Sequence, residues 1–172
     1  MIVRSAVLDD APAVAALYGH HVIHGTGTFE EEPPSPDDIA GRMKAVLDAG
    51  FPWLVIEVDG RIVAYAYAGP YHRRSAYRFT AEDSVYVADE ERGKGYGRAA
   101  LAAVIDACEA MGLRRLLAVI GDSQNVGSIG LHRALGFSFC GTLPAVGYKA
   151  GQWLDVVFME LPLNGGDPDR PD

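Results

Sequence analysis

The chain has 172 residues, 49% of them hydrophobic and 22% charged, with a formal net charge of −8. This length fits one domain with a substantial core, and no apolar run approaches the ~20 residues of a membrane-spanning helix. The acidic balance argues against nucleic acid as the main partner, and the N-terminal residues lack the basic-then-apolar layout of a signal peptide, so we expect a cytoplasmic protein.

The first third of the chain predicts one strand and two helices. Residues 2–7 alternate as a strand does, and Asp9 or Asp10 can cap a helix that runs to about residue 24. A loop with glycines, prolines and three glutamates follows. Ser35 then suits an N-cap and Pro36 the first helical position of a second helix, which Gly50 should end.

The middle of the chain predicts a hairpin and a further strand. The run WLVIEV-DG-RIVAYAYAG favours a β-hairpin, because Asp59-Gly60 suits a type I′ turn. A basic connection, HRRSAYRF, leads to a strand at EDSVYVAD. Two cysteines, Cys108 and Cys140, do not make a disulfide framework, and we expect Cys108 to lie in the core.

The second half predicts a βαβ unit and two more strands. A helix over about 95–111 has an apolar stripe at three- and four-residue spacing, and RRLLAVIG after it indicates a buried strand. A short helix should end at Gly136, and FSFCGTL and WLDVVFMEL are typical of strands. The members of the stripe are Leu101, Val104, Ile105, Cys108 and Met111. We therefore expect a mixed α/β sheet in one domain over residues 1–163, followed by a disordered tail, 164–172.

The stretch EERGKGYGRAALAAVI gathers cations and glycines between a strand and a helix. A helix N-terminus with close backbone approach binds phosphate groups, so this stretch predicts an anion cradle. It lacks the P-loop pattern, and GYGRAA fits the dinucleotide fingerprint only with too long a strand-to-helix turn. Taken alone, the stretch favours a simple helix entry with solvated cations over an anion site.

The surroundings of this stretch resemble the GNAT superfamily of N-acetyltransferases, and within it the phosphinothricin and methionine sulfone acetyltransferase subfamily. The motifs are TFE, EDSVYV, R-x-x-G-x-G, AVIG, LHRALGF and GYKAGQWLDV, which together span residues 2–163. The resemblance implies a mixed, mostly antiparallel sheet flanked by helices. It also implies acetyl-CoA as donor, a small amino acid as acceptor, no metal, and a homodimer.

The resemblance assigns the cofactor to the strand, the glycine-rich loop and the helix after the next strand. The implied oxyanion donor is the backbone N–H of Val87, and Asn125 would hold the pantetheine or simply cap its helix. The full implied set is Val85, Tyr86, Val87, Arg92, Gly93, Lys94, Gly95, Tyr96, Gly97, Arg98, Asn125 and Ser128.

Two residues are candidate catalytic groups. Glu82 matches the subfamily's glutamate and would deprotonate the acceptor amine, with Asp83 as a close rival. Alternation places Glu82 and Asp83 on opposite faces of their strand. His132 stands where many superfamily members have a tyrosine that protonates the thiolate. It could do the same, assist the glutamate, or be a packed core residue.

The acceptor site is expected from the loop before the second helix and from the basic connection. Arg74 is the first choice for binding the acceptor carboxylate, because a guanidinium suits a carboxylate bidentately. Phe29 and Tyr77 could form the walls of the pocket, and Glu30 could accept a hydrogen bond from the ammonium of the acceptor. Arg78, which is near Arg74 in sequence, belongs to the same expected set. Solvated loop charges are the alternative for these arginines.

Three functions fit these patterns. The first is an acetyl-CoA-dependent N-acetyltransferase acting on phosphinothricin, methionine sulfoximine or methionine sulfone. The others are a non-catalytic CoA- or nucleotide-binding module and a nicotinamide-dependent oxidoreductase. His20, His21 and His24 do not follow a known metal-binding pattern, so we expect them at a subunit contact or at the wall of the substrate site.

Overall fold

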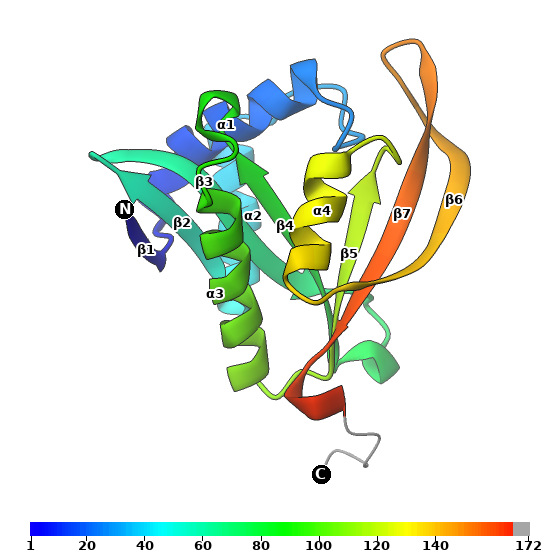
Figure 1. Ribbon diagram of the computed structural model, residues 1–172. Helices are drawn as coiled ribbons and strands as arrows, with labels where there is room; N and C mark the ends of the chain where they lie inside the picture. Colours follow the sequence, from blue (N-terminus) through cyan, green and yellow to red (C-terminus); the bar gives the residue numbers. More distant parts are fainter. Residues whose placement is uncertain (167–172) are drawn as a thin grey trace.

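The computed structural model describes residues 1–166, which form one seven-stranded sheet in the order β1-β2-β3-β4-β5-β7-β6 (Figure 1). Only β4 and β5 are parallel neighbours, so the predicted mixed, mostly antiparallel sheet with a βαβ unit is confirmed. The strands are β1 Ile2–Ser5, β2 Trp53–Val58, β3 Arg61–Pro70, β4 Thr80–Val87, β5 Arg115–Gly121, β6 Ser138–Lys149 and β7 Gln152–Pro162.

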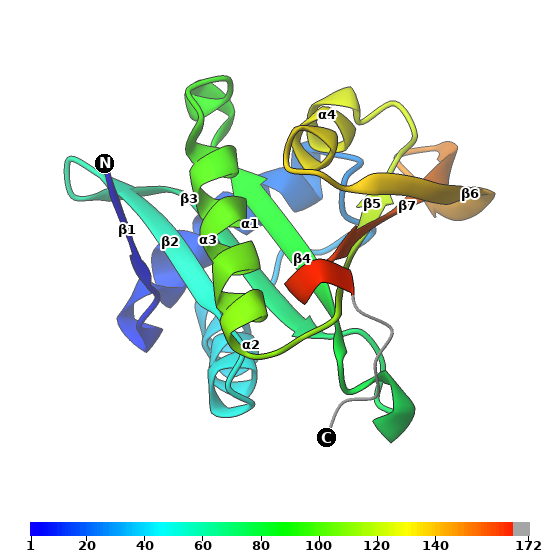
Figure 2. The same ribbon diagram turned by 60° about the horizontal axis from the view of Figure 1, so that its bottom comes forward.

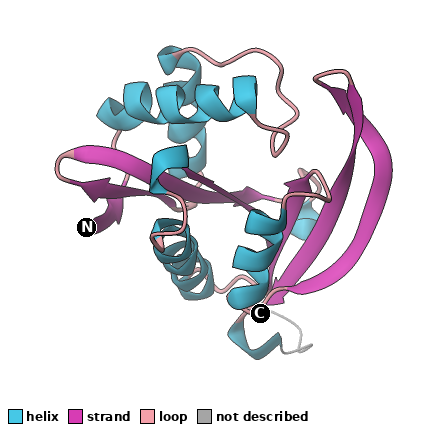
Figure 3. Cartoon of the chain, turned by 45° about the horizontal axis from the view of Figure 1, so that its top comes forward, coloured by secondary structure: helices cyan, strands magenta, loops and turns pink. Residues whose placement is uncertain are grey.

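Helices cover both faces of the sheet (Figure 3). Helices α1 (Ala11–His24) and α2 (Pro36–Asp48) bury one face around Trp53, Val55 and Tyr65. Helices α3 (Tyr96–Ala110) and α4 (Val126–Ala134) cover the other face, where α3 buries the small residues of β3. The core is therefore two layers with the sheet between them.

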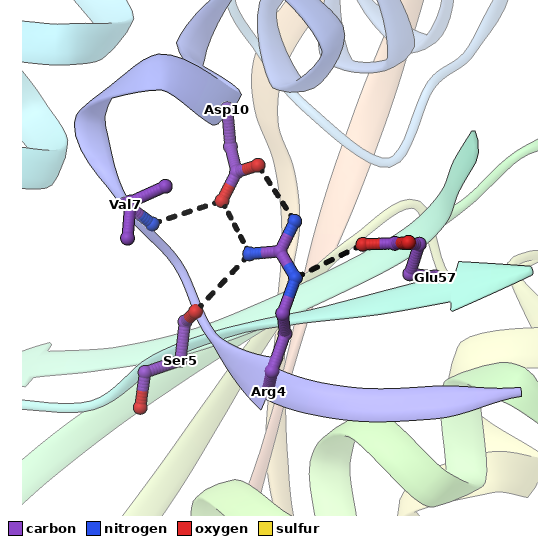
Figure 4. Close-up of polar contacts among 5 residues, drawn as sticks. All are labelled: Arg4, Ser5, Val7, Asp10 and Glu57. Atoms are coloured by element: carbon purple, nitrogen blue, oxygen red, sulfur yellow. Dashed lines mark hydrogen bonds and ion pairs between the residues drawn. The ribbon is translucent and has the colours of Figure 1, made fainter. Parts of the chain in front are cut away.

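The helix starts show which sequence signals were decisive. The Ser35 hydroxyl accepts from Asp38 N at 3.1 Å and the Asp38 carboxylate accepts from Ser35 N at 3.0 Å, which is the predicted cap. The expected cap of α1 is wrong in detail. Asp10 precedes α1, but its carboxylate accepts from Val7 N at 2.9 Å and pairs with Arg4, which also binds Glu57 (Figure 4). Asp10 therefore ties β1 to the helix entry.

The β2–β3 turn, Met111 and the C-terminal residues each bear on a sequence prediction. The β2–β3 turn is confirmed, with φ values of 50° at Asp59 and 76° at Gly60. Met111 does not belong to the buried stripe of α3, because it follows the last helical turn and is 39% exposed. The tail prediction is wrong for 164–166, where the Asn164 amide donates to the carbonyls of Glu109 and Leu113. Residues 167–172 lie outside the described part of the chain.

The feature that creates a site is the divergence of β4 and β5. Their pairing ends at Asp83 and Ala118, and beyond this point the strands separate toward their carboxyl ends (Figure 1). Ala88 N donates to Val63 O at 2.9 Å, so the even-numbered residues of β4 bond to β3. In an antiparallel ladder the alternate residues then point their N–H groups the other way. The N–H groups of Val85 and Val87 therefore face the gap.

Candidate functional site

A groove of about 860 Å³ occupies the gap between β4 and β5. Two of its walls are the strands themselves, residues 83–87 of β4 and residues 118–120 of β5. The others are the start of α3, the first turns of α4, and the last turn of α1 with residues 25–28. Every residue of the predicted cofactor set lines it except Lys94. The groove is therefore one continuous surface built from segments that are distant in the sequence.

The glycine-rich loop forms one end of the groove. Gly93 and Gly95 have φ values of 77° and 87°, which favour glycine, and Gly95 is the residue before α3. A Cβ on Gly97 would lie 3.1 Å from Val87 Cγ2, so a side chain there would crowd the junction of α3 and β4. The unpaired N–H groups of the first turn of α3 are thus left open to an anion.

The cations of this loop are partly paired with acids. Arg92 lies 2.6 Å from Asp89, and Lys94 lies 2.8 Å from Glu91. Lys94 does not line the groove and is exposed beside Glu91, so its expected place in the cofactor set stays a prediction. The backbone of the loop, with Arg92 and Arg98 beside it, remains as the phosphate-binding element.

The exposed edge of β4 is held by α1. The Nε2 of His21 donates to Val87 O at 2.9 Å, and burial lowers the pKa of this imidazole, which keeps it neutral. The side chain of Tyr86 turns to the opposite face, where it stacks edge-on with Tyr18 at 5.0 Å. Of the predicted residues on β4, Val85 and Val87 thus present their backbone N–H to the groove, whereas Tyr86 contributes mainly packing.

Helix α4 closes the groove with a capped N-terminus. The Asn125 side chain accepts from Ser128 N at 3.2 Å, so the helix-cap interpretation is confirmed, and Asn125 also lines the groove. Ser128 O accepts from His132 Nδ1 at 2.8 Å. The cap and the histidine are therefore parts of one short helical unit.

His132 is paired with Asp83. The distance between His132 Nε2 and Asp83 Oδ2 is 3.0 Å, and the two side chains are 3% and 0% exposed. Both ring nitrogens face acceptors, which favours the doubly protonated imidazolium. Burial alone would lower the pKa of His132, but the hydrogen bond and charge of Asp83 raise it overall. Burial raises the pKa of Asp83, with His132 opposing this.

The pair leaves one polar atom without a partner. Asp83 Oδ1 is buried, and within residues 1–166 it accepts no hydrogen bond. Both Asp83 and His132 line the groove. No contact joins His132 to Glu82 among these residues, so the alternative in which the histidine assists the glutamate directly is not supported by the geometry.

Glu82 points to the other face of the sheet, as alternation predicts. Its neighbours there are Ser84 on the same strand and Tyr67, which is the cross-strand partner of Ser84. Burial raises the pKa of Glu82, and the charge of Asp83 raises it further. Ser84 shares this face through the alternation of β4, as the sequence predicts, whereas Tyr67 was not identified from the sequence. The position of Tyr67 beside Glu82 becomes visible only when β3 and β4 are paired.

The predicted acceptor residues fall into two groups. Glu30 has both carboxylate oxygens bound to Arg42, at 2.6 and 3.0 Å, and accepts from Tyr18 at 2.9 Å. The hydrogen bond with Arg42 lowers the pKa of Glu30. Glu30 is therefore already an ion-pair partner, which weakens its assignment as the acceptor of the substrate ammonium. Phe29 is 37% exposed and packs beside β6.

The second group lies on the connection between β3 and β4. Arg74, Tyr77 and Arg78 are exposed there, at the amino end of β4, whereas the glycine-rich loop is at its carboxyl end (Figure 2). Arg78 lies over the Phe79 ring at 4.5 Å. No ion pair of the described residues includes Arg74. Within one chain the fold does not bring this group against Phe29 and Glu30.

The remaining candidates have simpler settings. His20 pairs with Asp89 at 2.8 Å, and His20, His21 and His24 all line the groove, which agrees with the expected wall position. Residues 1–166 contain no group of three His, Cys, Asp or Glu side chains that could hold a metal ion. Cys108 is fully buried, as predicted. No helix in the same range is long and apolar enough to cross a membrane.

Comparison with known proteins agrees with this architecture. Residues 18–137 match the acetyltransferase (GNAT) family. The chain is 51% identical over 164 residues to phosphinothricin N-acetyltransferase of Alcaligenes faecalis, covering 95% of this chain and 83% of that protein. It is 42% identical to the L-methionine sulfoximine/L-methionine sulfone acetyltransferase of Pseudomonas paraeruginosa, covering 98% and 96%.

A solved structure supports the same relationship. The phosphinothricin acetyltransferase of Sinorhizobium meliloti, solved in complex with AcCoA, superposes with a TM-score of 0.95 at 41% identity, covering 99% of this chain and 92% of that one. The sequence-based resemblance and the fold class are therefore confirmed.

Proposed function

The chain belongs to the GNAT family and is an N-acetyltransferase, and on that premise we propose that its acceptors are small amino acids of the phosphinothricin and methionine sulfoximine type. The relatives named above act on such acceptors, and they cover nearly the whole chain. The acetyl group comes from acetyl-CoA, which the Sinorhizobium meliloti relative binds in its solved structure.

The observation that carries the proposal is the wedge between β4 and β5 with the glycine-rich loop at its rim. The N–H groups of Val85 and Val87 face a groove that ends at the N-terminus of α3. This arrangement fits a long ligand with amides along its middle and phosphates at one end. We propose that the lining residues from Val85 to Val87, Arg92 to Arg98 without Lys94, and Asn125 with Ser128 hold acetyl-CoA.

Acetyl transfer requires an amine without its extra proton, and we assign its removal to Glu82. Acetyl-CoA supplies the activated thioester carbonyl. Glu82 is half-buried, and its raised pKa brings it closer to the working pH of a general base. Asp83 is the weaker candidate, because it is buried on the opposite face and bound to His132. The N–H of Val87 would stabilise the oxyanion, since it points into the groove.

We assign to His132 a role at the thiol end of the groove, exerted from its pair with Asp83. An imidazolium in a buried site stabilises negative charge on a leaving sulfur through its positive potential. Because its two N–H groups are already engaged by Asp83 and Ser128, direct proton donation would require one of these bonds to break. Turnover of the histidine variant is therefore the relevant test.

The acceptor carboxylate is assigned to Arg74, with Tyr77 and Arg78 as neighbours, and Phe29 would form a wall of the same site from the second copy of a homodimer. Support comes from the position of Arg74 directly before the short turn Ser75–Tyr77 that leads into β4, and from its lack of an ion pair among the described residues. Glu30 is kept only as a part of the wall, held by Arg42.

We further propose a cytoplasmic homodimer. The use of acetyl-CoA, an intracellular metabolite, supports the cytoplasmic location. The support for a second copy is the β6–β7 hairpin, which carries an unusual number of large exposed apolar side chains. They are Phe139, Leu143, Val146, Tyr148 and Trp153, with exposures of 60%, 49%, 51%, 58% and 66%. A sedimentation measurement that gives a monomer at micromolar concentration would contradict this assignment.

The experiment that tests the function is an acceptor screen with detection of the released thiol. Phosphinothricin, methionine sulfoximine and methionine sulfone should release CoA from acetyl-CoA, and free CoA or acetyl-CoA should raise the melting temperature because they bind only the folded protein. Binding of acetyl-CoA without thiol release from any amine would favour a non-catalytic module. Stabilisation by NAD and not by acetyl-CoA would favour the oxidoreductase and overturn the proposal.

A further inference from the structure

The loop between α1 and α2 crosses the open end of the groove. We call residues 25–30 the strap. It leaves α1, which packs on the β4 side of the wedge, and it contacts the strands on the other side. Thr26 Oγ1 donates to Asp122 Oδ2 at 2.5 Å, just after β5. The strap therefore joins two halves of the sheet that no longer pair with each other.

Two glycines receive the strap. A Cβ on Gly121 would lie 2.9 Å from Gly27 O and 3.0 Å from Phe29 Cε1. A Cβ on Gly147 would fall into the Phe29 ring, with Cε2 as its nearest atom, Cδ2 at 2.5 Å and Cζ at 2.9 Å. Separations under about 3 Å between carbon atoms are strongly repulsive. The ring of Phe29 thus occupies the space that a side chain at Gly147 would need.

A buried lysine fixes the same segment. Lys149, two residues after Gly147 on β6, is 6% exposed and its Nζ donates to Thr28 O at 2.7 Å. Burial lowers the pKa of Lys149, with the charges of Glu31 and Glu30 opposing this. A buried ammonium is costly unless it is hydrogen-bonded, so the bond to Thr28 O is the reason that this lysine can stay inside. Thr28 and Phe29 are therefore held from one strand.

We propose that Gly147 and Lys149 determine acceptor affinity, because they fix the strap that carries Phe29 and Glu30 to the acceptor site. Neither residue is assigned to contact the acceptor, so both are positioning residues. The inference rests on the proposed function only for what the strap binds. A shift of about 1 Å in a positioning element can cost ~10²-fold in rate. The contacts of Gly147 and Lys149 with the strap, which we call the latch, are therefore a sensitive point.

The first test compares two glycine-to-alanine substitutions on one strand. Gly147→Ala should raise the acceptor KM by roughly 10-fold to 100-fold, with a smaller change in the acetyl-CoA KM. Gly141→Ala is the matched control, because a Cβ there meets nothing within 4 Å, and its KM values should stay within about 2-fold of wild type. Equal acceptor KM values in the two variants would overturn the proposal.

The second test asks whether the clash with Phe29 is the cause. In a Phe29→Leu background the ring is gone, so adding Gly147→Ala should have little further effect on the acceptor KM. A full additional effect in that background would overturn the assignment of the clash. Both measurements are made on folded protein, since the thermal unfolding of each variant is recorded first.

The third test is independent of turnover. Lys149→Met keeps the aliphatic stem and removes the ammonium, and the loss of one charged hydrogen bond should speed amide hydrogen exchange in residues 25–30 by roughly 10-fold while α3 is unchanged. Unchanged exchange in the strap would overturn the latch. If the wild type acetylates no acceptor but Lys149→Met still loosens the strap, the proposed function fails and the latch stands.

Discussion

Replacing His132 by alanine would test the buried pair with Asp83 most directly. The substitution leaves a carboxylate whose side chain is 0% exposed with neither of its oxygens compensated by a cation. Removing one partner of a buried ion pair typically costs about 3–5 kcal/mol. A domain of this length changes its melting temperature by about 2–4 °C per kcal/mol. We therefore expect a fall of roughly 6–20 °C in the Tm of His132→Ala.

The matched companion is the double variant His132→Ala/Asp83→Asn. It removes the stranded charge, so it should recover at least about 1 kcal/mol of the loss seen in His132→Ala. The pH dependence has a defined sign. The pKa of His132 is raised above its usual 6.5, so the stability that it contributes is complete below pH 6.5 and is lost as the pH rises through the raised value. The double variant should lose stability less steeply than wild type above pH 6.5.

The assay is denaturant unfolding of wild type and both variants between pH 6 and pH 8, together with initial rates at saturating acetyl-CoA. A loss below about 1 kcal/mol in His132→Ala, or a double variant no more stable than the single one, would refute the ion-pair argument. If the double variant regains both stability and turnover, His132 is a packing residue. A variant that regains stability but stays slow supports a role of the imidazolium in catalysis.

Three further outcomes follow from the groove and the acceptor face. Gly95→Ala and Gly97→Ala should weaken acetyl-CoA binding more than folding, because a Cβ at the entry to α3 would block the close approach of the phosphates to the backbone; equal Kd values by calorimetry would contradict this. Glu82→Gln should lower kcat by ~10²–10⁴-fold with an unchanged acetyl-CoA Kd. The acid limb of the wild-type kcat/KM profile should lie above pH 4.5, because the pKa of Glu82 is raised. Loss of turnover in Asp83→Asn but not in Glu82→Gln would assign the role of the base to Asp83 instead. Arg74→Ala should raise the acceptor KM and leave the acetyl-CoA KM nearly unchanged. A carboxamide acceptor that reacts as well as the free acid would contradict the carboxylate contact.

Much of the local structure was readable from the chain. The Ser35 cap, the Asp59-Gly60 turn, the helix after the glycine-rich loop and the alternation of Glu82 and Asp83 each depend on residues close in sequence. Short-range signals of this kind are set by backbone sterics and local hydrogen bonds, which tertiary packing rarely reverses. Asp10 shows the limit. Asp10 suits a helix cap locally, but its carboxylate pairs with Arg4 instead. A sequence pattern does not place the Arg4 side chain beside Asp10.

The functional site divides in the same way. The cofactor loop could be located because a helix N-terminus and its glycines are contiguous, whereas the ion pair of Lys94 with Glu91 depends on the fold of the loop. The partner of His132 could not be known from sequence, since 49 residues separate it from Asp83. The position of Tyr67 beside Glu82 required the register of β3 and β4.

Contiguous motifs and the two-residue period of a strand were enough to predict the fold family, the donor-binding loop and the face of β4 that carries Glu82. Three features required the folded chain: the separation of β4 and β5 beyond Asp83, the pairing of His132 with Asp83, and the contacts of Gly147 and Lys149 with the strap, where Lys149 and Thr28 are 121 residues apart. Contacts between such distant segments are fixed by the packing of whole elements against the sheet. No local pattern of residue types encodes them.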